Sequence, residues 1–243
     1  MSTASIPSGS PAGPGRFVYE WPRPSVTADV ALFRLAAEAR APRVEVLLIR
    51  RGRPPFADTW ALPGGFVDRD EDLPAAAARE LAEETGVRGV RLEQVGVIGT
   101  PGRDPRGHTV TALYTAALPT RAAAVKAGDD AAAADWFSPD ALPALAFDHG
   151  ELVRWAVLHW RDRLGRSPLL FDLLPRRFDV TELRRAWTAV AGGAQGFGPA
   201  FRKLAANGAV VQAAATRSGA RALHRVDRRA LARLDPLAPR AGR

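Results

Sequence analysis

Apolar and polar positions in the first 163 residues follow two different periods. Short apolar runs predict strands, whereas apolar positions three and four apart predict helices. One helix is expected over Ala75–Thr85, because Asp72 is a favourable N-cap and Gly86 suits the position after a helix end. Another lies within Ala141–Arg163. The expected strands are Val26–Leu35, Val44–Arg50, Val90–Ile98, His108–Ala117 and Asp135–Phe137. This order predicts a mixed α+β domain that ends in a helix.

A different pattern begins near Pro168. Asp179 precedes a helical segment that stops at a glycine pair, and a shorter helix is expected over Pro199–Asn207. Two strand-like segments, AVVQAAA and ARALHRV, follow and are joined by TRSG. Helix, turn, helix and hairpin in this order predict a small winged helix-turn-helix domain.

The chain of 243 residues is long enough for two small domains, each with its own core. The expected segments are a disordered tail over residues 1–18, a first domain over 19–163, the winged helix-turn-helix over 168–235 and a tail over 236–243.

Charge divides the chain in the same way. The net charge is +8, but residues 1–150 hold 16 basic and 19 acidic side chains, a net of −3. Residues 151–243 hold 18 basic and 7 acidic side chains, a net of +11. This asymmetry is expected of a ligand-binding domain fused to a nucleic-acid-binding domain.

Composition excludes several classes of protein. The chain has no cysteine, so a metal ion would need oxygen or imidazole ligands. Its longest strand-like apolar run, Val44–Ile49, is too short to cross a bilayer. The first residues, MSTASIPSGSPAGPG, lack the apolar centre of a secretory signal. We therefore expect a cytoplasmic protein without a membrane partner.

Three glutamates gather on one face of the first expected helix. Glu80, Glu83 and Glu84 are three and four residues apart or adjacent, so like charges crowd one surface unless a cation neutralises them. Mg²⁺ is a suitable partner because it prefers oxygen ligands and bridges carboxylates to phosphates. Three glutamates alone favour a solvated acidic helix face over a metal site.

The residues around these glutamates complete a longer motif, and a WALPGG segment at residues 60–65 precedes it. The spacing resembles the Nudix box at every specified position: Gly65, Glu71, Arg79-Glu80-Leu81, Glu83-Glu84 and Gly86-Val87. The resemblance implies an α/β/α sandwich with a mixed sheet, and hydrolysis of nucleoside diphosphates linked to another group.

The resemblance also implies roles for individual residues of the motif. Glu80 and Glu84 would be the principal ligands of Mg²⁺ or Mn²⁺, and Glu83 a further ligand or a base. Glu71 would pair with Arg79 and brace the loop onto the helix. Gly64 and Gly65 would allow the backbone to come close to the diphosphate.

A loop that follows the motif indicates which class of substrate the site handles. Pro101 and the following RDPRG segment resemble Nudix proteins that handle ADP-ribose. Arg103 and Arg106 are candidates for phosphate or ribose contacts, since arginine suits bidentate contacts with oxygen atoms. The alternative is a solvated loop in which Asp104 pairs locally.

One departure from the family pattern affects catalysis. Related sequences usually carry a glutamate shortly before the Trp of the segment GDDAAAADWF, and Ala133 stands there in this chain. Asp129, Asp130 or Glu83 are possible substitutes. Loss of a general acid–base group typically costs about 10²–10⁴ in rate, which is compatible with slow hydrolysis and intact binding.

The basic C-terminal part resembles the second domain of the Nudix-related transcriptional regulators, in which a Nudix domain senses ADP-ribose and a winged helix binds DNA. Arg202 and Lys203 fall early on the expected recognition helix, and Arg217 and Arg221 at or after the tip of the wing, followed by Arg225. The family's polar residues before the Phe-Arg pair are replaced by FGPA here.

Two hypotheses follow from the sequence. In the first, the chain is a regulator, expected as a homodimer on double-stranded DNA, that binds ADP-ribose or a related nucleotide and retains some hydrolase activity. In the second, it is a Mg²⁺-dependent ADP-ribose pyrophosphatase that releases AMP and ribose 5-phosphate, and its C-terminal domain is accessory.

Overall fold

The structure, a computed structural model, describes residues 10–11, 17–18, 21–36, 41–119, 131–213 and 223–234. Within the expected N-terminal tail, β1 (Ser10–Pro11) and β2 (Phe17–Val18) pair as a two-residue antiparallel ladder. Residues 1–9, 12–16 and 236–243 of the expected tails lie outside this description, as does residue 235 at the end of the expected second domain.

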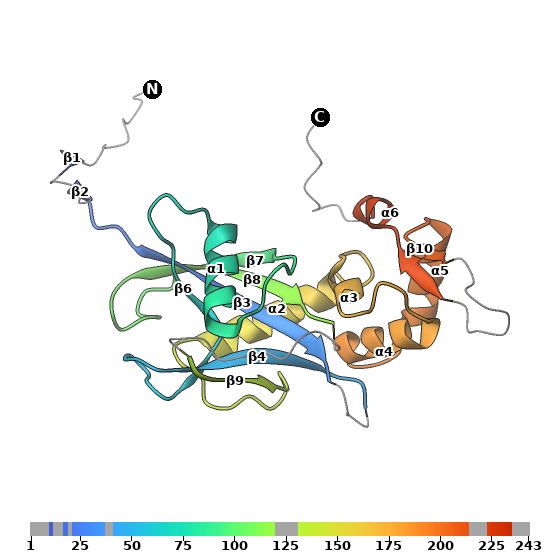
Figure 1. The fold of residues 1–243 in the computed structure, drawn as a ribbon, viewed down its shortest axis with the longest axis horizontal. Helices are drawn as coiled ribbons and strands as arrows, with labels where there is room; N and C mark the ends of the chain where they lie inside the picture. The colour runs from blue at the N-terminus through green and yellow to red at the C-terminus, as the bar shows by residue number, and fades with distance from the viewer. Residues whose placement is uncertain are drawn as a thin grey trace.

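A mixed sheet forms the centre of the first domain (Figure 1). Its strand order is β5-β4-β3-β8-β7, with β6 paired to β3 and β9 paired to β4. The two long strands β3 and β8 are parallel, whereas the other pairs are antiparallel. The strands are β3 (Ser25–Leu35), β4 (Val44–Arg51), β5 (Trp60–Ala61), β6 (Gly64–Phe66), β7 (Glu93–Ile98), β8 (Thr109–Ala117) and β9 (Ala131–Phe137).

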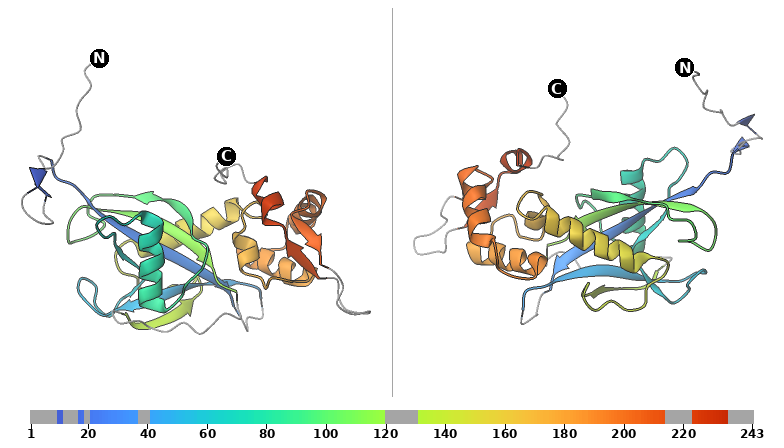
Figure 2. Two further views of the ribbon diagram at one scale, coloured as in Figure 1. Left: turned by 45° about the horizontal axis from the view of Figure 1, so that its top comes forward. Right: turned by 180° about the vertical axis from the view of Figure 1, so that it is seen from behind.

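Helices cover both faces of this sheet, as the two views of Figure 2 show. On one face α1 (Leu73–Thr85) packs its alanines and Leu81 onto the apolar side chains of β3 and β8. On the other face α2 (His149–Asp162) packs Leu152, Ala156 and Trp160. The predicted α/β/α sandwich with a mixed sheet is confirmed.

The local signals that begin and end α1 act as expected. The Asp72 side chain accepts a hydrogen bond from the Ala75 backbone amide at 2.8 Å. Gly86 ends the helix in the left-handed conformation, with φ of 73°. The α2 helix begins at His149, so the pattern over Ala141–Arg163 predicts its end better than its start.

The C-terminal region has the predicted order of helix, turn, helix and hairpin. Asp179 and Glu182 form a reciprocal capping box at the start of α4. The second helix starts two residues before the expected Pro199, and the hairpin tip at residues 214–222 lies outside the described residues. The elements are α3 (Leu169–Asp172), α4 (Val180–Ala191), α5 (Phe197–Ala206), β10 (Val210–Gln212), β11 (His224–Val226) and α6 (Arg228–Ala232).

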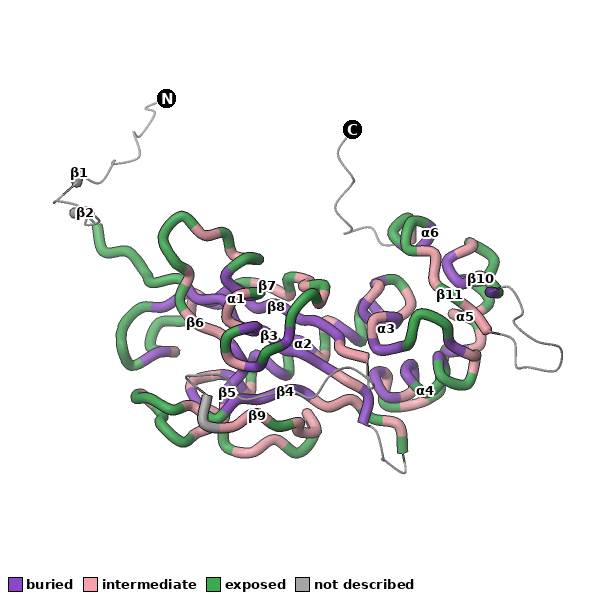
Figure 3. Tube along the Cα trace, in the orientation of Figure 1, coloured by how far each residue is buried: buried purple, intermediate pink, exposed green. Residues whose placement is uncertain are grey.

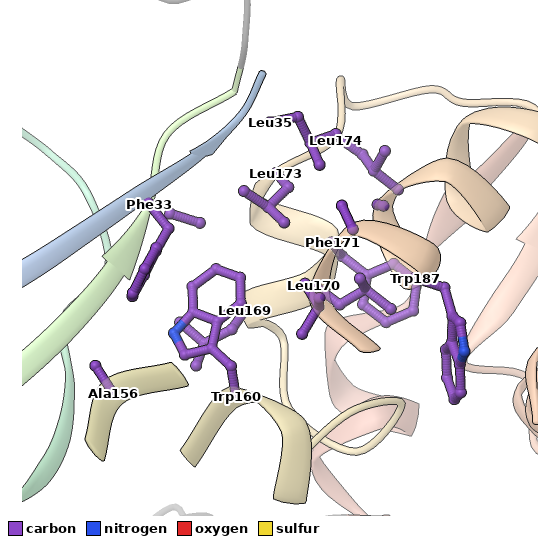
Figure 4. Packing of buried hydrophobic residues seen from close by; sticks show 14 of the residues in the cluster. Phe33, Leu35, Ala156, Trp160, Leu169, Leu170, Phe171, Leu173, Leu174 and Trp187 are labelled. Atoms are coloured by element: carbon purple, nitrogen blue, oxygen red, sulfur yellow. The ribbon is translucent and has the colours of Figure 1, made fainter. Parts of the chain in front are cut away.

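One hydrophobic cluster holds buried residues of both parts of the chain. It begins beneath α2 in the sandwich and continues through α3 into the C-terminal helices. Figure 4 shows Phe33 and Trp160 from the sandwich close to Leu169, Leu170 and Phe171 of α3. Since α3 also packs on β8, the C-terminal region is joined to the Nudix-like part through buried apolar contacts.

A buried ion-pair network reinforces the same junction. Glu93 on β7 lies 2.8 Å from His159 Nε2 and 2.7 Å from Arg163 Nε, and it accepts a hydrogen bond from Ser167 Oγ at 2.8 Å. Burial opposes ionisation of Glu93, but these partners outweigh burial and lower its pKa to about 2. Only 14% of the Glu93 side chain is exposed, so solvent screens the network weakly.

This network predicts how stability depends on pH. The pKa of Glu93 is lower in the folded chain than in the unfolded chain, so its contribution is complete above about pH 4.5 and is lost as the pH falls towards 2. The contribution is at most about 3 kcal/mol.

Glu93→Gln should therefore lower the unfolding midpoint at pH 7 and flatten the loss of stability in acid, whereas Glu151→Gln should have only the small effect of an exposed charge in the first turn of α2. Denaturant melts between pH 2 and pH 7 measure both effects. If the stability of the Glu93→Gln variant fell with decreasing pH as steeply as that of the parent chain, the proposed role of the network would be disproved.

Among the described residues, no helix combines the length and apolar character needed to cross a membrane.

Candidate functional site

The loop before α1 is held to the helix by one arginine. Arg79 donates from Nε and Nη2 to the two carboxylate oxygens of Glu71, both at 2.9 Å, and from Nη2 to the backbone oxygen of Phe66 at 3.0 Å. The hydrogen bonds from Arg79 lower the pKa of Glu71, so its carboxylate stays ionised. This is the pairing that the motif implies, and it fixes the loop that carries Gly64 and Gly65.

Those glycines bring backbone against two carboxylates. In the β3–β6 ladder, Gly64 lies opposite Asp29. A Cβ atom at Gly64 would come within 2.4 Å of Asp29 Oδ1, and one at Gly65 within 2.3 Å of Glu80 Oε1. Backbone atoms of Ala28 and Asp29 leave no room for a side chain at Gly64, so glycine is required there. At Gly65 an added Cβ atom would displace the Glu80 carboxylate.

The three glutamates of α1 occupy different environments. Glu84 is largely buried, and one of its oxygens accepts a hydrogen bond from the Gly64 amide at 2.9 Å. Glu80 is 14% exposed and lies 2.8 Å from Arg79 Nη1, whereas Glu83 is 57% exposed and lies 3.3 Å from the same nitrogen. The structure therefore brings Glu80 and Glu84 to the loop and leaves Glu83 at the rim.

Burial dominates the electrostatics of the inner pair. It raises the pKa of Glu84 to about 8, and the nearby carboxylates of Glu80 and Asp29 add to the shift while the Gly64 amide opposes it. Burial also raises the pKa of Glu80, although Arg79 opposes that shift. Such carboxylates are stabilised by a nearby cation, because a positive charge offsets the cost of removing them from water.

The donor set fits a hard divalent cation. Within the described residues, no group of three or more acidic or histidine side chains is arranged as a metal site, and Arg79 engages both Glu80 and Glu83. Glu80 and Glu84 supply two carboxylates beside the half-buried backbone of the glycine loop. Oxygen donors of this type are those that Mg²⁺ and Mn²⁺ prefer.

An open cavity of about 370 Å³ lies over these groups, lined by Glu80, Glu84 and Arg79. A smaller cavity of about 70 Å³ adjoins it, and the two share lining residues. The shared residues are Arg51, Gly64, Gly65, Phe66 and Arg106.

The two arginines of the RDPRG loop have different environments. Arg103 is buried, at 5% exposed, and makes a bidentate pair with Asp148 at 2.7 and 2.9 Å, so it ties the loop to the start of α2. Arg106 is 40% exposed and pairs with Asp104 at 2.7 Å. Its guanidinium lies 4.8 Å from the centre of the Phe66 ring, at the wall shared by both cavities. Arg106 Nε and Nη2 both donate to Asp104, so Asp104 pairs locally as the alternative expected, while the Arg106 side chain still lies at the cavity wall. Arg103 braces the loop.

Three residues of the cavity wall were not identified from the sequence. Asp29 is 5% exposed in the middle of β3 and accepts a hydrogen bond from Thr111 Oγ1 at 2.5 Å. His149 Nδ1 accepts a hydrogen bond from the Leu62 amide at 2.9 Å, so its proton is on Nε2, 3.9 Å from Asp29 Oδ1. Burial lowers the pKa of His149 and that of Arg51. The one available signal was the charged Asp29 between the apolar residues Ala28 and Val30 of this strand.

Ala133, which stands where related sequences usually carry a glutamate, lies on β9 in the structure. Ala133 pairs with Arg50, and Ala134 pairs with Ile49. Because directly opposed residues share a face of the sheet, Ala134 lies on the face of Ile49, whereas Ala133 lies on the other face. Both residues are alanines, so neither supplies a carboxylate. Asp129 and Asp130 lie outside the described residues.

The candidate DNA-binding residues are placed only in part. Arg202 and Lys203 are exposed on α5, while Phe197 and Leu204 of that helix pack inward. Arg225 is exposed on β11. Arg217 and Arg221 lie outside the described residues.

Known proteins share both parts of this architecture. The chain is 36% identical over 177 residues to the ADPR responsive transcriptional repressor NtrR of Acinetobacter baylyi. The matched segment covers 71% of this chain and 69% of that protein. The chain is also 40% identical over 118 residues to the ADP-ribose pyrophosphatase of Methanocaldococcus jannaschii. That match covers 49% of this chain and 68% of that protein.

A solved structure extends this similarity to the C-terminal region. Shewanella oneidensis NrtR complexed with a 27mer DNA matches with a TM-score of 0.68 and 27% identity, over 85% of this chain and 95% of that one. Its Nudix domain complexed with ADP ribose matches with a TM-score of 0.51 and 35% identity, over 59% of this chain and 90% of that one. The NUDIX domain family model matches residues 26–156, more than half of the chain. The chain therefore belongs to the Nudix family.

Proposed function

We propose that this protein is an ADP-ribose-responsive transcriptional repressor, whose Nudix domain binds the nucleotide and whose C-terminal region binds DNA. The observation that carries the proposal is the similarity to NrtR of Shewanella oneidensis across both parts of the chain, together with a complete glutamate helix beside an arginine-lined cavity. A winged helix on a two-fold DNA site favours a dimer.

The cavity has the chemistry that a nucleoside diphosphate needs. Arg106 and Arg51 line it with positive charge, and the glycine loop allows backbone to approach phosphate oxygens. Glu80 and Glu84 would hold Mg²⁺ or Mn²⁺, which neutralises phosphate charge when bound. The protein's own groups then orient the diphosphate between α1 and the RDPRG loop.

The C-terminal region has the complementary chemistry for DNA. Arg202 and Lys203 project from the exposed side of α5, and residues 151–243 carry a net charge of +11. Cationic side chains on a recognition helix neutralise backbone phosphates and release counterions.

Gly65→Ala tests the nucleotide site. The added methyl group would meet the Glu80 carboxylate, so ADP-ribose affinity in Mg²⁺ should fall by about ten-fold or more, the equivalent of one charge-assisted contact. Gly96→Ala on β7 is the matched control, because a Cβ atom there meets nothing within 4 Å. Isothermal titration calorimetry measures both variants, and parental affinity in Gly65→Ala would overturn the site.

Hydrolysis of ADP-ribose is a second candidate function. The intact set of Glu71, Arg79, Glu80, Glu83 and Glu84 favours it, as does the similarity to an ADP-ribose pyrophosphatase. Alanine at both 133 and 134 argues for slow turnover, since no carboxylate stands at either position. We therefore propose residual hydrolase activity in a protein that acts chiefly as a regulator.

A further inference from the structure

A second, larger groove lies where the Nudix domain meets the C-terminal region. Its volume is about 810 Å³. The Nudix side contributes residues next to β7 and the end of β8, and the C-terminal side contributes the segment between α3 and α4 together with β11 and the start of α6. Buried Phe171 and Phe178 line part of it, and the segment 175–177 at its edge is exposed (Figure 3).

The charged lining of this groove is almost entirely positive. Among the described residues it holds five arginines and one acid, Asp172, which gives this part of the lining a net charge of +4. Asp172 is shared by Arg91 of the Nudix side, at 2.9 Å, and Arg228 of the C-terminal side, at 2.5 Å. The remaining arginines are Arg176, Arg177 and Arg225.

These three arginines are exposed, and among the described residues their side chains make no hydrogen bond or ion pair. Guanidinium groups of like charge around one groove repel each other, and an anion within it relieves that repulsion. Arginine's planar fork is suited to bidentate contacts with phosphate oxygens. The lining therefore favours a ligand with several phosphate oxyanions over a monovalent ion.

The groove is separate from both sites considered above. It shares no lining residue with the cavities over Glu80 and Glu84. Arg202 and Lys203 of α5 are also absent from its wall. It is built from both parts of the chain, with Arg91 on one side and Arg176, Arg177 and Arg225 on the other.

We propose that this junction groove binds the phosphate groups of a polyanion, either a free polyphosphate or nucleotide or the backbone of bound DNA. An occupant would be held chiefly by Arg176, Arg177 and Arg225 of the C-terminal side, because Arg91 already pairs with Asp172 and Glu93. The proposal is independent of the ligand of the Nudix cavity.

Arg176→Gln/Arg177→Gln in the full chain tests this site with inorganic tripolyphosphate in metal-free buffer. The matched control is Arg154→Gln/Arg184→Gln, which removes two exposed, unpaired charges on α2 and α4 outside the groove. Titration calorimetry measures tripolyphosphate affinity, and anisotropy measures the salt dependence of binding to duplex DNA from the protein's own upstream region. Circular dichroism melts verify that all variants are folded.

Loss of about ten-fold or more in tripolyphosphate affinity, in the groove variant alone, supports a free anion as the ligand. A drop in DNA affinity and in its salt dependence, again in the groove variant alone, supports the DNA backbone as the source of the phosphates. Equal behaviour of the groove and control variants in both measurements overturns the proposal, because a general loss of positive charge would then explain the result.

Discussion

Glu84→Gln is expected to lower Mg²⁺-dependent hydrolysis of ADP-ribose by about 100-fold or more, because the metal's charge stabilisation is worth several kcal/mol and depends on this carboxylate. The glutamine keeps an acceptor for the Gly64 amide, which Glu84 now holds at 2.9 Å. The fold of the glycine loop should therefore survive while the negative charge is removed. Release of AMP by the purified chain measures the effect.

The control for this substitution is Glu151→Gln, which removes a carboxylate from the exposed side of α2. Binding of Mn²⁺, followed by electron paramagnetic resonance, gives a second measurement that does not depend on turnover. It should weaken in Glu84→Gln and stay unchanged in Glu151→Gln. Unchanged turnover and unchanged Mn²⁺ affinity in Glu84→Gln would remove Glu84 from the metal site.

Arg202→Gln/Lys203→Gln should weaken DNA binding and reduce the slope of log affinity against log salt by about 2, if each side chain neutralises one phosphate. Both residues are exposed on α5, so the substitutions remove charge without disturbing the core. Anisotropy titrations over a range of salt concentrations measure affinity and slope together.

Arg154→Gln/Arg184→Gln serves again as the control, because it changes the net charge equally at positions away from α5. A salt slope that falls equally in both double variants would indicate a diffuse electrostatic effect. That result, or parental affinity and slope in the α5 variant, would contradict the assignment of α5 as the recognition helix.

Local signals explain which parts of the fold could be predicted. Asp72 and Gly86 mark the ends of α1 within a few residues, and Asp179 marks the start of α4, because caps act through neighbouring backbone groups. The strand β6 was missed because its sequence, Gly-Gly-Phe, has no apolar alternation, and its pairing with β3 is a long-range contact.

The site was predictable only where its residues belong to one motif. The Glu71–Arg79 pair follows from a single loop and helix. Asp29 and His149, in contrast, come from elements 120 residues apart, and only the folded sheet brings them to the same cavity. The apolar junction between the two parts could not be predicted for the same reason, since the direction in which α3 packs depends on the sandwich beneath it.

Nucleotide binding in the Nudix domain is expected to control DNA binding by the C-terminal region, and the two share one hydrophobic cluster through α3. The affinity of the full chain for duplex DNA from its own upstream region, measured at fixed salt with and without saturating ADP-ribose, tests this coupling. ADP-ribose should change that affinity by at least about five-fold, the lower end of typical allosteric coupling. The change should be absent in Gly65→Ala at the same ADP-ribose concentration and retained in Gly96→Ala. Specific DNA binding that is identical with and without ADP-ribose would contradict the account.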